Sequence, residues 1–156
     1  MVEGSKEVLQ RFTQDVFVYT DHYKGKESGK SPGFGVALVA ETVTGSLIGA
    51  ERVAEGGGEL PEDVGKEAAT LLMDQLLLGG CVDTTNQPLL LMFMSLCPED
   101  VSRLRIGSEL SPAAIETLRL AKQFVGVVFK IERQSDQTIL LSCVGSGMEN
   151  VHKIVR

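Results

Sequence analysis

The double glycine Gly79-Gly80 is the feature that most constrains how this chain folds. It stands between two stretches with apolar residues at helical spacing, one reaching Leu76 and the other starting after Pro88. Glycine is common directly past the end of a helix, because it adopts the left-handed backbone that closes the last turn. A chain of 156 residues forms one domain or two small ones. We therefore expect a domain junction between Gly79 and Asp83.

The half before the glycines has the pattern helix, three strands, helix. Residues 5–12 place apolar side chains on one helical face. Residues 16–20, "VFVYT", have the β-branched and aromatic composition of a strand, and residues 35–42 and 46–53 predict a hairpin. The second helix begins at Pro61, a residue that suits the first helical position. Its predicted apolar stripe is Val64, Ala68, Leu71, Leu72 and Leu76.

The half after the glycines has the pattern helix, strand, helix, strand, strand. Residues 89–96 are apolar nearly all round, so we expect this helix to be buried on most faces, with Thr85 or Asn86 as its cap. Ser111 is the predicted cap of the next helix. A hairpin formed by "VVFKIER" and "TILLSCVG" closes the chain. Both halves thus predict two-layer α/β (α+β) sandwiches, the second with helices on one face of a mixed sheet.

Composition fits a protein with a packed core and gives no sign of a membrane partner. Hydrophobic residues make up 43% of the chain. No apolar run reaches the roughly 18 residues that span a bilayer, and the first residues contain no apolar export signal. The net charge of -6 arises within residues 41–74, which hold eight acidic and two basic residues. This balance argues against a general nucleic-acid binder and leaves a local basic patch open.

The stretch from Gly25 to Ser31 has a superficial likeness to a nucleotide-binding phosphate loop. That motif requires four residues between its glycines, whereas Gly25 and Gly29 have three between them. It also requires a helix directly after the loop, and here Pro32 leads towards a strand. We therefore expect a surface loop that connects strands and no bound nucleotide.

Seven basic residues are the candidates for contact with RNA or an acidic partner. Arg103 and Arg105 share the outward face of a predicted strand, with Leu104 and Ile106 inward. The other candidates are Arg119 and Lys122 on one helix, and Lys24, Lys26 and Lys30 in the loop. The alternative is a solvated surface with local pairs such as Glu116 with Arg119.

The sequence indicates no catalytic or metal-binding residue. Cys81, Cys97 and Cys143 are scattered without metal-ligand spacing and are interpreted as reduced, buried thiols, with a catalytic cysteine as the alternative. His22 and His152 are too far apart in the sequence to indicate a metal site. His22 neighbours Asp21 on a predicted strand, where adjacent side chains point to opposite faces, so we expect a structural role for it.

Three stretches resemble the RNA 3'-terminal phosphate cyclase family, in particular its nucleolar, cyclase-like branch. They are "YTDHYKGKESGKSPGFG", "LPEDVGKEAATLLMDQLLLGGCVDTTNQPLLLMFMSL" and the closing "FKIE…LLSCVGSGMEN". The resemblance covers nearly the whole chain and places it in the C-terminal part of the family's sequence. It implies that residues 1–80 belong to the C-terminal part of an inserted small α/β domain. It also implies that residues 82–156 end the core domain, which is built from βαβαββ-type repeats.

The same resemblance implies that this chain lacks the cyclase nucleophile. Cyclases of the family adenylylate a histidine at the start of the last core helix and then close an RNA 3'-phosphate into a cyclic phosphate. In the family, an apolar stretch that ends in Phe follows this histidine, and when that Phe is set on Phe124, the histidine position falls on Ala113. An alanine methyl group cannot form a phosphoramidate with AMP. No cyclase activity and no cofactor are therefore expected.

The function implied by the resemblance is in ribosome biogenesis. The expected role is that of a non-cyclase scaffold in 18S pre-rRNA processing and small-subunit assembly, located in the nucleolus. The implied partners are pre-rRNA, the small-subunit processome and a nucleolar ribosome-assembly GTPase. The alternatives are an RNA-processing enzyme, either a pre-rRNA endonuclease or an RNA 3'-terminal phosphate cyclase, and an acidic interaction module that stands alone.

Overall fold

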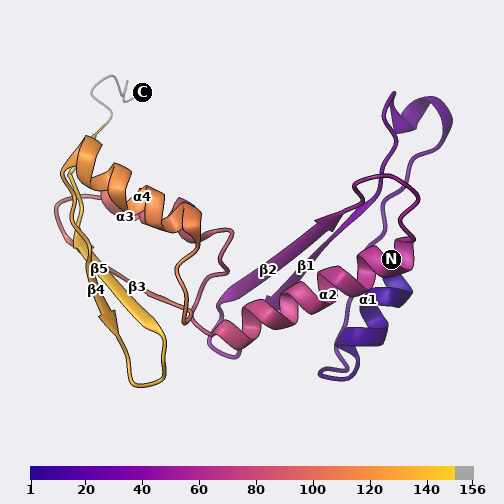
Figure 1. Ribbon diagram of the computed structural model, residues 1–156, viewed down its shortest axis with the longest axis horizontal. Helices are drawn as coiled ribbons and strands as arrows, with labels where there is room; N and C mark the ends of the chain where they lie inside the picture. Colours follow the sequence, from indigo (N-terminus) through magenta and orange to yellow (C-terminus); the bar gives the residue numbers. More distant parts are fainter. Residues whose placement is uncertain (150–156) are drawn as a thin grey trace, which may run out of the picture. The chain divides into compact units, whose positions relative to one another are not determined.

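The computed structural model describes residues 1–149 and divides the chain into two compact units, Met1–Leu77 and Leu78–Arg156. Each unit has its own hydrophobic core and its own antiparallel sheet (Figure 1). The predicted α/β composition is confirmed, because helices and a small sheet occur in both units. Among the described residues, no helix combines the length and the apolar character needed to cross a bilayer.

The first unit consists of two helices and a two-stranded sheet. Helix α1 (Val2–Leu9) comes first, and the hairpin of β1 (Gly35–Glu41) and β2 (Leu47–Val53) precedes helix α2 (Pro61–Leu78). The hairpin and α2 lie where the sequence predicts them. Helix α1 ends at Leu9, so Phe12, expected on its apolar face, lies beyond the helix and is 69% exposed. The loop between α1 and β1 contains one short 3-10 turn, η1 (Gly25–Ser28).

The predicted strand at residues 16–20 is wrong. These residues have no regular structure, and the side chains of Phe17 and Tyr19 are 81% and 93% exposed. Only Val16 packs against the core of this unit. A β-rich composition forms a strand only where a neighbouring strand supplies hydrogen bonds and packing, and β1 and β2 pair with each other instead.

The core of the first unit forms where α1, α2 and the inner face of the hairpin meet. Its buried residues are Leu9, Ile48, Ala69 and Leu72. The predicted stripe on α2 is shifted at one position, because Leu71 is 41% exposed while Gly65 lies inside. The hydroxyl of Ser5 on α1 donates to the carbonyl oxygen of Gly65 over 2.9 Å, so the two helices are in close contact there.

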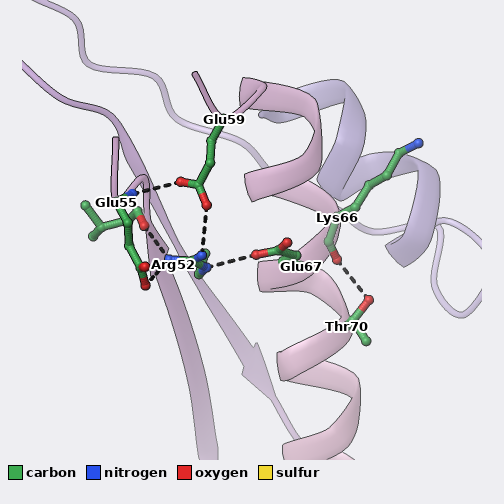
Figure 2. Close-up of polar contacts among 7 residues, drawn as sticks. Arg52, Glu55, Glu59, Lys66, Glu67 and Thr70 are labelled. Atoms are coloured by element: carbon green, nitrogen blue, oxygen red, sulfur yellow. Dashed lines mark hydrogen bonds and ion pairs between the residues drawn. The ribbon is translucent and has the colours of Figure 1, made fainter. Parts of the chain in front are cut away.

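Three acidic side chains of the first unit surround one guanidinium group (Figure 2). Arg52 on β2 donates from Nε to Glu67 on α2 over 2.9 Å, and its Nη atoms contact Glu59 at 3.1 Å and Glu55 at 3.2 Å. The hydrogen bond with Glu67 is the main reason that the pKa of Arg52 is raised. Three of the eight acidic residues between 41 and 74 therefore serve to hold β2, the following loop and α2 together.

A second ion pair joins the two helices of this unit. Lys66 on α2 lies with its Nζ 2.9 Å from the Oε2 of Glu7 on α1. The hydrogen bond from Lys66 lowers the pKa of the Glu7 carboxyl, and the same bond raises the pKa of Lys66. Both groups are thus charged across the neutral pH range, and the pair reinforces the helix contact at Gly65.

In its described residues, 78–149, the second unit is a three-stranded sheet with two α-helices. Helix α3 (Gln87–Leu96) is followed by β3 (Val101–Ile106), helix α4 (Pro112–Leu120) and a π-helical turn, η2 (Ala121–Val125). Strands β4 (Lys130–Arg133) and β5 (Ile139–Val144) close the unit. The strand order is β3-β5-β4, and β5 runs antiparallel to both neighbours, so the predicted mixed sheet is wrong for the described residues.

Both helices of the second unit cover the same, inner face of the sheet (Figure 1). Ile106 and Leu141 from the sheet pack with Leu91 from α3 and Ala114 from α4, and all four side chains are fully buried. The predicted alternation on β3 is confirmed, with Leu104 and Ile106 turned inward. The expectation that α3 is buried on most faces is wrong, because Leu89, Met92 and Phe93 are 45%, 45% and 53% exposed.

The N-terminal cap that the sequence predicts is confirmed for α4, whereas Asn86 does not serve as a side-chain cap for α3. Ser111 caps α4 as predicted, and its side chain accepts from the backbone N–H of Ala114 over 3.2 Å. The side chain of Asn86 does not cap α3. It donates to Asp83, whose buried carboxylate also accepts from the Asn86 backbone N–H over 2.9 Å. Asp83 thus organises the start of α3.

The double glycine is packed into the second unit and does not act as a loose linker. The backbone N–H of Ser108 donates to the Leu78 carbonyl over 2.9 Å, and that of Cys81 donates to the Arg105 carbonyl over 3.0 Å. Gly80 has a positive φ of 85°, and a Cβ atom added to it would overlap the backbone of Gly107. The segment after α2 can therefore lie against the end of β3, because each of the two segments has a glycine at the contact, Gly80 in one and Gly107 in the other.

We expect Gly65→Ala to destabilise the first unit, against the ordinary preference for alanine in helices. At a free helical site this change stabilises by about 1 kcal/mol. Here the added methyl group would overlap the carbonyl oxygen of Met1, and overpacking of this kind costs roughly 1–3 kcal/mol. Urea unfolding measures the difference. Thr70→Ala, at an exposed position of the same helix, is the control and should leave stability nearly unchanged. A raised urea midpoint for Gly65→Ala would contradict the packing described.

Candidate nucleic-acid interface

The four candidate cations of the second unit lie on two different sides of it. Arg103 and Arg105 are exposed on the outer face of the sheet. Arg119 and Lys122 belong to α4 and η2, and these elements cover the inner face. The sequence could not separate the two pairs, because the side of the sheet on which α4 packs is decided by the core. The structure therefore brings Arg103 and Arg105 together and does not add Arg119 and Lys122 to them.

Arg103 and Arg105 differ in how they are engaged. The guanidinium of Arg105 lies 3.6 Å from the carboxylate of Asp136 in the β4–β5 turn, with both side chains more than half exposed. The pKa of Asp136 is lowered mainly by the hydroxyl of Thr138, which donates to it over 2.6 Å. Arg103 has no carboxylate partner within residues 1–149. Of the two arginines, Arg103 is thus the one whose charge is not locally compensated.

Strand register adds two residues to this face that the sequence alone did not reveal. Arg103 on β3 stands opposite Ser142 on β5, and Ser142 stands opposite Lys130 on β4. Lys130 is exposed and forms an ion pair of 2.8 Å with Glu132 on the same strand. Arg103, Ser142 and Lys130 come together because β5 pairs with both β3 and β4 in this register. No local pattern in the sequence specifies that pairing.

On the helical side, Arg119 has a local partner, whereas Lys122 has no ion pair within the described residues. Arg119 contacts Glu116 at 2.5 Å, which is the local pair foreseen as the alternative to a binding role. Lys122 is exposed on η2. It lies two residues before Phe124, which is 77% exposed.

An apolar groove of about 460 Å³ lies between α3 and the α4–η2 segment. Its apolar wall includes Leu89 and Met92 from α3 and Leu120 and Phe124 from the other side. Leu89 and Met92 are two of the three exposed side chains that make α3 less buried than its composition predicted.

The three loop lysines of the first unit are exposed and lie in an irregular segment that contains one short 3-10 turn. Lys24, Lys26 and Lys30 flank or belong to the 3-10 turn η1, and all three are exposed. None has an ion pair within the described residues. The strand β1 begins only at Gly35, so no helix follows the loop, as the sequence predicted. The preceding residues are not a strand, so the expectation that the loop connects two strands is wrong.

Within residues 1–149, the structure does not bring histidines or cysteines into a reactive cluster. The hydroxyl of Tyr23 donates to Asp21 over 3.2 Å, and His22 beside them is exposed. His152 lies outside the described residues. Within the described residues, no group of three or more His, Cys, Asp or Glu side chains is placed to hold a metal ion.

The expectation that all three thiols are buried holds for one of them. Cys143 is buried, and burial raises the pKa of its thiol, whereas Cys81 is half-buried and Cys97 is exposed. Cys97 directly follows α3 and Cys81 follows the double glycine, so neither lies within a helix or a strand.

The start of α4, where Ala113 lies, is fixed by the side chain of Gln87. This amide is 1% exposed, donates to the Glu109 carbonyl over 3.0 Å and accepts from the Ser111 N–H over 2.9 Å. Both bonds hold the loop that leads into α4. Ala113 itself is exposed, and its carbonyl oxygen accepts from the hydroxyl of Thr117 over 2.9 Å.

Comparison with known proteins places this fold in a family. Residues 1–77 match the family "RNA 3'-terminal phosphate cyclase (RTC), insert domain". The whole chain is 42% identical to the RNA 3'-terminal phosphate cyclase-like protein of Mus musculus, over 44% of that protein's length. A probable RNA 3'-terminal phosphate cyclase-like protein of Dictyostelium discoideum is also 42% identical, over 97% of this chain and 44% of the relative.

The chain belongs to the RNA 3'-terminal phosphate cyclase-like family. It is also 37% identical along its full length to the rRNA processing protein rcl1 of Schizosaccharomyces pombe, covering 43% of that protein. The chain thus spans less than half the length of the curated relatives it matches. That share is consistent with the predicted C-terminal part of a cyclase-like sequence.

Within this cyclase-like chain, we expect Gln87→Ala to destabilise the second unit by about 2–4 kcal/mol. The change removes a buried side chain and leaves the Ser111 N–H and the Glu109 carbonyl without their partner. Urea unfolding gives the stability, and amide hydrogen exchange at Ser111 should accelerate. Gln123→Ala, at an exposed position of η2, is the matched control. Equal stability of the two variants would contradict a structural role for the Gln87 amide.

Proposed function

We propose that this chain serves in rRNA processing, as a binding scaffold for small-subunit assembly and not as a cyclase. The observation that carries the proposal is the similarity along the whole chain to a relative named as an rRNA processing protein. The relatives named as cyclase-like cover the chain equally well. Both kinds of name, rRNA processing protein and RNA 3'-terminal phosphate cyclase-like protein, therefore support a function in RNA metabolism.

The absence of a nucleophile at Ala113 supports the non-cyclase part of the proposal. A methyl group cannot carry AMP, and the position is exposed at the start of a capped helix. The sequence contains only His22 and His152 as histidines, and both lie more than thirty residues from Ala113. No neighbouring histidine in the sequence can take over the role by a small shift.

The proposal extends to place and partners. Small-subunit rRNA is made and first processed in the nucleolus, so a protein of this function works there. We propose pre-rRNA, the small-subunit processome and a ribosome-assembly GTPase as its partners, in accordance with the family resemblance. The second unit, as the end of the cyclase-like core, and the first, as part of the insert, are proposed to present separate surfaces to them.

Depletion of the protein in its own cells tests the role in rRNA processing. We expect precursors of the small-subunit rRNA to accumulate and mature small-subunit rRNA to fall, because early cleavage depends on the complete assembly complex. Northern hybridisation with probes on each side of the cleavage sites measures both. Large-subunit precursors are the internal control and should stay near their normal level. Unchanged small-subunit precursors after depletion would refute the proposal.

Adenylylation tests the non-cyclase assignment separately. We expect no label on the protein after incubation with α-labelled ATP and an RNA that ends in a 3'-phosphate, because Ala113 offers no nucleophilic nitrogen. Gel autoradiography detects protein-bound AMP, and thin-layer chromatography detects a cyclic phosphate end. An active RNA 3'-terminal phosphate cyclase under the same conditions is the positive control. A labelled adenylate on this protein would favour the enzyme alternative.

A further inference from the structure

The outer face of the β3-β5-β4 sheet carries a row of three polar residues, one from each strand. Arg103, Ser142 and Lys130 stand directly opposite one another in the register. The two helices of the unit pack on the inner face of the sheet, so they do not cover this row. Both cationic side chains of the row are exposed. The central residue is a small hydroxyl between two long cations.

The spacing of the row suits a single phosphate group. Neighbouring strands lie about 4.8 Å apart, so the backbones of Arg103 and Lys130 are separated by about 10 Å, with Ser142 midway. Long side chains on the two outer strands can converge above the small residue on the central one. An arginine fork binds two phosphate oxygens at once, a lysine supplies a point charge, and a serine hydroxyl donates a hydrogen bond.

Little free energy is needed to release the cations of the row from their present ion pairs, so their charges are available to a phosphate group. Arg103 has no carboxylate partner within the described residues. Lys130 is paired with Glu132, but both side chains are substantially exposed, and such pairs contribute little. Arg105 lies two residues along β3 on the same face, about 7 Å further on, and its contact with Asp136 is long at 3.6 Å. A second phosphate along the strand would therefore meet a second arginine.

We propose that this outer face binds the RNA backbone, with Arg103 and Lys130 holding one phosphodiester over Ser142. The choice of RNA as the polyanion rests on the proposed role in rRNA processing. The other candidate cations fit the task less well, because Arg119 and Lys122 lie on the helical side of the unit and the loop lysines belong to an irregular segment. The contact is with phosphate and carries no base specificity of its own.

Fluorescence anisotropy with a labelled twelve-nucleotide single-stranded RNA of mixed sequence tests the proposal on the full chain. We expect Arg103→Gln and Lys130→Gln each to weaken binding about fivefold to tenfold at low salt. Each lost phosphate contact should also reduce the slope of log K against log salt by about 0.7. Ser142→Glu keeps both cations but places a carboxylate between them, and it should weaken binding at least as much.

Arg133→Gln is the matched control, since it removes an exposed arginine of β4 that stands opposite the buried Ile139, on the other face of the same sheet. It should leave both affinity and salt slope unchanged, and circular dichroism should be equal for all variants. If the double variant Arg103→Gln, Lys130→Gln binds RNA like the unchanged chain, the proposal is overturned. It is also overturned if an oligo-glutamate peptide of equal length competes as well as RNA.

The outcome is separable from that of the proposed function. Loss of RNA binding in the row variants supports the site, whatever depletion shows for rRNA precursors. If depletion blocks small-subunit processing but the row variants bind RNA normally, the role in rRNA processing stands and this site falls. Binding of RNA through the row without any processing defect on depletion would retain the site and remove the proposed function.

Discussion

Close backbone contact at glycine is the constraint on which both units depend. In the first unit, α1 and α2 approach so closely at Gly65 that a single methyl group would overlap the neighbouring carbonyl. In the second, Gly80 and Gly107 let the segment after α2 lie against the end of β3. At each of these places a side chain larger than glycine would force the packed segments apart.

The packing of the second unit also determines which of its cations are available for binding. Both helices are used to cover the inner face of a sheet of only three strands, so the outer face keeps its side chains exposed. On that face Arg103 lies in register with Lys130 across Ser142. On the helical side, Arg119 is engaged with Glu116. The core thus separates one set of basic residues into a sheet surface and a helix surface, and each surface has one arginine paired with a carboxylate.

Sequence patterns predicted elements well wherever a local signal and the tertiary contact agreed. The hairpin around Gly45, the start of α2 at Pro61 and the Ser111 cap of α4 were all found from local chemistry. The strand at residues 16–20 failed because no neighbouring strand pairs with it, and the buried α3 failed because no element in the described residues covers one of its apolar faces. In both cases the amino-acid composition favours the predicted structure. The structure differs because the neighbouring strand or covering element that it needs is missing from the described residues.

The sequence by itself determined the α/β class, the position of the double glycine, the alternation of Arg103 and Arg105 with Leu104 and Ile106, and alanine at position 113. These properties follow from residue type and local periodicity. Only the tertiary structure decided that the four cations of the second unit lie on two sides and that Lys130 and Ser142 join Arg103. It also decided that Gln87 holds the start of α4. These relations join residues far apart in the chain, and they are fixed by strand register and by which face of the sheet the helices bury.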